Sequence, residues 1–196
     1  MGSFWNKRNA VISGIAITIL GTYFVYQSPT PLNFSMSKTS SDVPDLEFRL
    51  SQTSSSPPTI LVTLKNTSPD TPYTLLKWGT PLDSAALNTG VFSIVGEEDD
   101  EEVKQFVLQI NRKMPPAQEE VVTLVPGTEK EVEVVFDKPW MLERKPAKYK
   151  VKAVGDFKGL WDKDASDVTE QNLYAYIESP LSGKKFATNE IVMEVE

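Results

Sequence analysis

Hydrophobic and polar residues alternate along short stretches of the chain between residues 46 and 195, and this alternation predicts β-strands. It is clearest in residues 131–136 and 148–153. One face of each stretch would be apolar, and the other would carry glutamates in the first and lysines in the second. One apolar and one charged face per strand is typical of antiparallel sheets that pack against each other. The inward-facing residues are predicted to be Val132, Val134, Phe136, Tyr149, Val151 and Ala153.

Strand-like stretches follow one another at short spacing, with turn formers such as Pro126-Gly127 between them and no long amphipathic helix. The chain is therefore predicted to be all-β, with an immunoglobulin-like antiparallel β-sandwich as its fold and a closed barrel as the alternative. The predicted strands are Leu46–Gln52, Thr59–Asn66, Tyr73–Trp78, Val91–Val95, Val103–Asn111, Val121–Leu124, Glu129–Phe136, Tyr149–Phe157, Leu173–Ile177 and Glu190–Val195.

Residues 10–26 form an uncharged apolar stretch of seventeen residues, about the minimum length for a membrane-spanning helix. Lys7 and Arg8 precede it, so the positive-inside tendency predicts a cytosolic N-terminus, residues 1–9, and an exported remainder. Two interpretations compete: a cleaved signal peptide of a secreted protein, and an uncleaved anchor of a single-pass type II membrane protein. The bulky residues 22–26 favour the anchor, because signal-peptide cleavage sites need small residues.

The exported part begins with a Ser/Thr/Pro-rich stretch, residues 27–44, which is predicted to be a flexible stalk. Residues 45–196 are predicted to form one β-sandwich domain. A second polar run, Ser51–Pro58, lies between two predicted strands and is interpreted as a hairpin loop. The expected organisation is a single N-terminal hydrophobic helix, a stalk and one folded domain.

The composition excludes several function classes. The 196 residues include no Cys and no His, which removes thiolate metal sites and the Ser-His and Cys-His nucleophile pairs. We therefore expect neither enzymatic activity nor a metal or other cofactor. A net charge of -7 without a basic cluster argues against a nucleic-acid partner. A hydrolase that uses paired carboxylates is a low-ranked alternative, because the acids alternate outward or lie in one loop.

Six consecutive acids, residues 97–102, lie between two predicted strands. A calcium site or an acidic docking loop is one interpretation. Calcium loops place their oxygen ligands at intervals, usually with Gly or Asn between them, whereas a solid block of carboxylates repels itself. A solvated hairpin tip is therefore predicted, and docking to a basic partner stays open.

Two sequons for N-glycosylation begin at Asn33 and Asn66. Both lie on the exported side of residues 10–26, the first in the predicted stalk and the second in a predicted turn. Both are therefore candidate glycosylation sites.

The Asn-Thr turn at residues 66–67 and the run Thr74–Ile94, TLLKWGTPLDSAALNTGVFSI, resemble the N-terminal propeptide domain of fungal deuterolysin-type metalloproteases, the aspzincins. The resemblance covers residues 46–196 and rests mainly on the run Leu75–Asp83. Three later runs also resemble that domain: Val121–Asp137, Lys148–Trp161 and Glu178–Glu196.

In that family the propeptide assists folding of a zinc peptidase domain and keeps it latent. The peptidase carries a His-Glu-x-x-His helix and a Gly-Thr-x-x-Asp motif. Because this chain has no such helix, no catalytic or zinc residue is carried over. The resemblance implies a stand-alone, non-catalytic domain that binds a deuterolysin-type metalloprotease or another secretory-pathway protein, as an inhibitor or a folding assistant.

A second hypothesis is a structural or adhesion spacer at the cell surface. The apolar residues 10–26, as a membrane attachment, and the acidic loop 97–102 both depart from the secreted pattern of the propeptide family.

Overall fold

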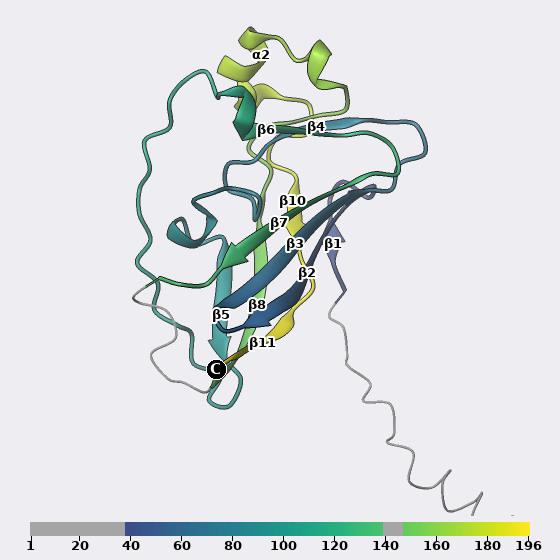
Figure 1. Ribbon diagram of the computed structural model, residues 1–196. Helices are drawn as coiled ribbons and strands as arrows, with labels where there is room; N and C mark the ends of the chain where they lie inside the picture. The colour runs from purple at the N-terminus through teal and green to yellow at the C-terminus, as the bar shows by residue number, and fades with distance from the viewer. Residues whose placement is uncertain (1–37, 139–146) are drawn as a thin grey trace, which may run out of the picture. The chain divides into compact units, whose positions relative to one another are not determined.

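The computed structural model describes residues 38–138 and 147–196 (Figure 1). The predicted N-terminus 1–9, hydrophobic helix 10–26 and sequon at Asn33 lie outside the described residues. Among the residues described, no helix is long and apolar enough to cross a membrane.

The described residues form antiparallel strands, short 3₁₀ turns and a five-residue α-helix. The strands are β1 (Ser40–Ser41), β2 (Leu46–Ser55), β3 (Pro58–Asn66), β4 (Tyr73–Leu76), β5 (Phe92–Gly96), β6 (Val121–Leu124), β7 (Glu129–Val135), β8 (Ala147–Asp156), β9 (Leu160–Trp161), β10 (Lys185–Ala187) and β11 (Ile191–Val195). The helical elements are η1 (Ala86–Asn88), η2 (Gln118–Glu120), η3 (Ala165–Asp167), α2 (Glu170–Tyr174) and η4 (Tyr176–Glu178).

Two sheets make up the sandwich. One has the order β2-β3-β7, and the other is built around β8, which pairs with β5 on one edge and with β11 and then β10 on the other. β1 extends this second sheet beyond β10. All of these pairings are antiparallel, so the all-β sandwich expected from the alternation is confirmed.

The core lies between the two sheets, where each strand contributes every second side chain. Phe48 in β2 packs on Phe157 and Phe186, with ring centroids 6.1 and 5.0 Å away. Along β8 the predicted inward residues Tyr149, Val151 and Ala153 are all buried. Burial of these apolar faces is the main term that holds the sheets together.

A third, smaller sheet has the order β6-β4-β9. In Figure 1 it lies at the same end of the domain as α2 and its flanking 3₁₀ turns. Thr169 begins α2 with a capping box, in which its hydroxyl accepts from Asn172 N–H and the Asn172 side chain accepts from Thr169 N–H. This cap explains why Leu173–Ile177 is helical, so the strand predicted there is wrong.

Three further predictions are corrected by the structure. Val103–Asn111 is not a strand: only an isolated bridge between Val95 and Glu102 marks its start. The predicted stalk 27–44 also extends too far, because β1 pairs with β10 and Val43 is buried in the core. The predicted hairpin loop at Ser51–Pro58 is shorter than expected, since β2 and β3 pair as far as Ser55 and Pro58.

Candidate protein-binding surface

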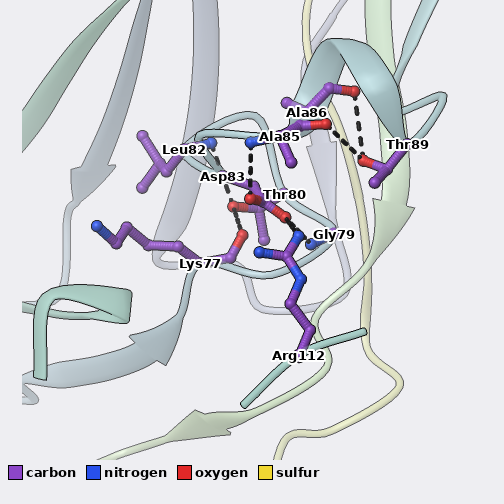
Figure 2. A network of polar contacts seen from close by, with 9 residues as sticks. All are labelled: Lys77, Gly79, Thr80, Leu82, Asp83, Ala85, Ala86, Thr89 and Arg112. Carbon is purple, nitrogen blue, oxygen red and sulfur yellow. Dashed lines mark hydrogen bonds and ion pairs between the residues drawn. The ribbon is translucent and has the colours of Figure 1, made fainter. Parts of the chain in front are cut away.

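The turn that follows β4 folds around Asp83, a residue that Figure 2 shows surrounded by backbone donors. The Thr80 hydroxyl starts this turn by donating to Lys77 O at 2.7 Å and accepting from Leu82 N–H at 3.2 Å. Gly79 before it has a φ of +72°, which disfavours any residue with a Cβ. The residues that end the predicted strand thus form a closed turn.

The Asp83 carboxylate is fully buried and accepts three hydrogen bonds. Gly79 N–H donates at 3.1 Å, Ala85 N–H at 2.9 Å and the Arg112 guanidinium at 2.5 Å. A buried carboxylate is tolerated only when it is paired and hydrogen-bonded. Arg112 is therefore the counter-ion of this turn, and it fixes a distant part of the chain to it.

The turn sequence Gly79-Thr80-Pro81-Leu82-Asp83 has the Gly-Thr-x-x-Asp spacing of the aspzincin metal motif. Here the Asp83 oxygens are occupied by backbone N–H groups and by a cation. In the part of the chain that the structure describes, no three acids are grouped so that they could hold a metal ion. Asp83 therefore acts as a structural anchor in this turn.

Arg112 also stacks on Trp78, with its guanidinium carbon 5.3 Å from the ring centroid. Tyr176 in η4 meets the same indole edge-on at 5.7 Å. The indole nitrogen of Trp78 is buried, and no hydrogen-bond partner is found for it among the described residues. The indole thus acts as an apolar platform that holds Arg112 over the Asp83 carboxylate.

The segment from Val103 to Arg112 is extended and tied down at intervals. Val103 N–H donates to Ile94 O at 2.8 Å, and the Gln105 side-chain amide donates to Phe92 O at 2.7 Å. Leu108 N–H donates to Asn88 O at 2.7 Å. Together with the Arg112 ion pair, these contacts fix the backbone, while the apolar side chains between residues 106 and 110 are exposed.

Four large apolar side chains of this segment face solvent, and we call them the apolar strip: Phe106, Val107, Leu108 and Ile110. Their exposed fractions are 66%, 61%, 55% and 36%. Neighbouring exposed apolar residues on a fixed backbone are a feature of protein interaction sites. The sequence shows that this run is apolar, but its pattern predicts a strand there and not an exposed surface.

The acidic residues 97–102 form the tip of the hairpin that leads into the apolar strip. Gly96 N–H donates to Glu101 O at 2.8 Å, and Asp100 N–H donates to Gly96 O at 3.2 Å, so the tip is a closed turn. Residues 98–102 are exposed, and Asp100 forms an ion pair with Lys150. The solvated hairpin tip expected here is confirmed.

Asn66 is not placed where a glycan could be attached. It is fully buried, and its side-chain nitrogen donates to Thr71 O at 2.9 Å and to Leu124 O at 3.0 Å. Its side-chain oxygen accepts from Ser68 N–H at 2.9 Å. A glycan would replace one of the two hydrogens that this nitrogen donates and would have to fit beside a fully buried side chain, so the folded structure argues against the candidate site at Asn66.

The carboxylate-hydrolase alternative required two buried acids facing each other in a pocket. Among the described residues, Asp83 is the only buried acid, and its oxygens are already used in the turn. The apolar strip and the acidic tip beside it remain available to other molecules.

An antiparallel β-sandwich of this kind defines an immunoglobulin-like protein class. The profile described as an immunoglobulin-like domain matches residues 45–195, so the chain belongs to that family. It is also similar to an uncharacterized secreted protein of Arthroderma benhamiae, with 31% identity over 104 residues. The matched region covers 52% of this chain and 52% of that protein, so the match spans about half the length of the relative. Neither match is to a metalloprotease or its propeptide.

Proposed function

We propose that the chain is a non-catalytic, extracytoplasmic immunoglobulin-like module that binds a protein partner through the apolar strip and the neighbouring acidic tip. The observation that carries this proposal is the exposure of Phe106, Val107 and Leu108 on a backbone fixed at both ends. A merely structural spacer would have no use for such a surface. The secreted description of the relative supports an exported location.

The size of the surface is compatible with a specific but separable complex. Full burial of a Val, Leu, Ile or Phe side chain contributes about 1.5–3 kcal/mol. Because the strip is already part-buried, covering the rest contributes about 4 kcal/mol, or roughly a thousandfold in the dissociation constant. The acids at residues 97–102 add attraction for a basic partner and increase its association rate.

The first partner to test is a deuterolysin-type metalloprotease, because the run Leu75–Asp83 resembles the propeptide domain of those enzymes. In this proposal the module restrains the enzyme or assists its folding. The zinc chemistry belongs entirely to that partner.

Binding of the full chain to a purified deuterolysin-type protease, measured together with the rate of peptide cleavage, tests this proposal. We expect a complex that a triple substitution, Phe106→Ser with Val107→Ser and Leu108→Ser, weakens at least a hundredfold. Val135→Ser in β7, at a residue that is 39% exposed, is the matched control and should leave binding unchanged. An unaltered cleavage rate and no complex would reject the protease as partner and favour the spacer hypothesis.

A further inference from the structure

A second surface of the domain, the outer edge of β6, carries unpaired backbone groups. Among the described residues β6 pairs only with β4, in a register that joins Leu76 to Val121 and Thr74 to Thr123. Leu76 N–H donates away from β6, to Gly159 O at 2.9 Å. In an antiparallel ladder, Val121 and Thr123 must then direct their own backbone groups away from β4, to the outer edge.

The backbone groups on this edge are only partly used. Val121 N–H donates to Gln118 O in the preceding 3₁₀ turn. None of the hydrogen bonds found among the described residues uses Thr123 N–H, Thr123 O or Val121 O in the outward direction. A donor and two acceptors therefore stand in the alternating arrangement that a further strand would pair with.

A groove of about 490 Å³ lies along this edge. β6 forms one wall, and the segment from η3 to α2 forms the other, which agrees with the position of α2 beside β6 in Figure 1. Most of the lining side chains are apolar, so the groove can hold every second side chain of a peptide strand that is added to the β6 edge. The lining residues are Gln118, Val121, Thr123, Ala165, Val168 and Leu173.

Acidic residues flank the groove-lining residues along the chain. Glu119 and Glu120 follow Gln118 at one end; on the opposite wall Asp164 precedes Ala165, Asp167 precedes Val168, and Glu170 begins α2. The ammonium group of the nearby Lys163 donates a hydrogen bond to Asn172 Oδ1 at 3.3 Å. An apolar floor between negative rims is complementary to a peptide that alternates apolar residues with Lys or Arg.

Two other strand edges of the domain, those of β5 and β2, are protected. The outer edge of β5 is covered by residues 101–105, through the bonds of Val103 and Gln105. The outer edge of β2 is closed by two side-chain amides. The Asn189 amide pairs with the backbone of Leu50 in β2, and the Gln52 amide of β2 pairs with the backbone of Glu194. β6 lacks such a cover among the described residues, although it lies beside an apolar groove.

We propose that the β6 edge binds an extended, basic-apolar peptide segment of a partner protein by β-strand addition. The peptide backbone pairs with Thr123 N–H, Thr123 O and Val121 O. Its apolar side chains enter the groove beside Val168 and Leu173, and its basic side chains lie against the rims. This site is separate from the apolar strip and does not depend on a protease as partner.

A phage-displayed library of random twelve-residue peptides, selected on the immobilised full chain, tests the proposal. We expect enrichment of peptides that alternate apolar residues with Lys or Arg. The best of them, made synthetically, should slow amide hydrogen exchange at Thr123. Thr123→Pro removes the edge donor without breaking a backbone bond to β4, although it also removes the hydroxyl contact with Thr74, and should weaken this peptide at least tenfold.

Leu173→Glu is a second variant, which leaves β6 intact and places a charge in the groove; it should also weaken the peptide at least tenfold. The triple substitution in the apolar strip should bind the peptide normally, so failure of this proposal is distinguishable from failure of the proposed function. Absence of enrichment, or enriched peptides that bind both groove variants as tightly as the native chain, would overturn the proposal.

Discussion

The side-chain amide of Asn189 pairs with the backbone of Leu50 as though it were a residue of a neighbouring strand. Leu50 N–H donates to Asn189 Oδ1 at 2.8 Å, and Asn189 Nδ2 donates to Leu50 O at 3.0 Å. Leu50 lies in β2 of one sheet, and Asn189 precedes β11 of the other. Gln52 makes a similar contact with Glu194, through bonds of 2.6 and 2.8 Å. Two amides thus join the sheets along this side of the sandwich.

Asn189→Ala is expected to lower the free energy of unfolding by about 2–4 kcal/mol, because it leaves the N–H and C=O of Leu50 without partners in a part-buried position. Gln52→Ala is the matched control. Its contact with Glu194 is exposed, so water replaces the lost bonds and the loss should be about 1 kcal/mol or less. Urea unfolding of both variants measures the difference. Equal losses would contradict the role given to Asn189.

Asn66 connects four parts of the chain, because every polar group it carries is bonded. Its N–H donates to Thr128 O at 2.9 Å and its carbonyl accepts from Gly127 N–H at 3.1 Å, in addition to its three side-chain bonds. Asn66→Asp should therefore lower the free energy of unfolding by about 3 kcal/mol at neutral pH, since a buried carboxylate would face two carbonyl oxygens.

Burial should raise the pKa of the introduced carboxyl above that of the unfolded chain. Because this pKa is raised in the folded state, the Asn66→Asp chain comes nearest to the stability of the native chain at low pH. The difference in the free energy of unfolding between the two chains grows as the pH rises through the folded pKa. Unfolding at several pH values checks this. A deficit that does not depend on pH would show that the carboxylate has reached water.

The chain isolated from a eukaryotic secretory host is expected to carry no glycan at Asn66, because the acceptor nitrogen is buried and donates two hydrogen bonds. Peptide mass spectrometry after enzymatic removal of N-glycans in heavy-oxygen water reads each sequon separately. Occupancy at Asn66 in folded protein would contradict the structure. The sequon at Asn33 stays a prediction and serves as the internal comparison.

Most strands could be predicted from the sequence because each has one apolar face and the turns between them are rich in Gly, Pro and Asn. The run at Val103–Asn111 shows the limit of that argument. Alternation reports that a segment has an apolar face, but not that a partner strand exists to bury it. Here the path of the segment is decided by Arg112, whose partner Asp83 lies 29 residues earlier. No local pattern reveals that ion pair.

The candidate site was predictable to a similar extent. The acidic tip at residues 97–102 could be placed because a block of like charges must remain solvated. The apolar strip beside it could not be recognised as a surface, since its composition is also that of a core strand. The helical turn at Glu170–Tyr174 was missed because its signal is a capping box of Thr169 and Asn172, in a run otherwise rich in strand formers.

Glu47 gives the domain a stabilising contact that depends on pH. The hydroxyl of Thr39 donates a hydrogen bond to the Glu47 carboxylate at 2.8 Å, and this bond is the main cause that lowers the pKa of Glu47 below its usual 4.5. Partial burial opposes this lowering of the pKa, and Arg49 reinforces it. A lowered pKa means that the contact stabilises the fold above the unfolded value and is lost as the pH falls through the folded value.

Thr39→Val should therefore flatten the fall in stability below pH 4.5, without changing stability in strong acid. Denaturant unfolding at a series of acidic pH values provides the measurement. Thr63→Val is a matched control, because its hydroxyl lies 3.4 Å from Glu131 in a long, exposed contact and should leave the profile unchanged. An identical profile for Thr39→Val and the native chain would remove Thr39 as the cause.

Arg112→Met tests whether the ion pair with Asp83 fixes the apolar strip. The methionine keeps an apolar contact with Trp78 but leaves a buried carboxylate without its cation, so we expect a loss of about 3 kcal/mol in the free energy of unfolding. Amide exchange at Leu108 should also accelerate, because the anchor next to it is gone. Adding Asp83→Asn should restore part of the stability, since a neutral amide is cheaper to bury than an unpaired charge, but should not restore slow exchange in the strip.

A single Arg112→Met variant within 0.5 kcal/mol of the native chain would mean that the two backbone N–H groups of Gly79 and Ala85 satisfy Asp83 by themselves. In that case the strip must be held by the contacts of Gln105 and Leu108 alone.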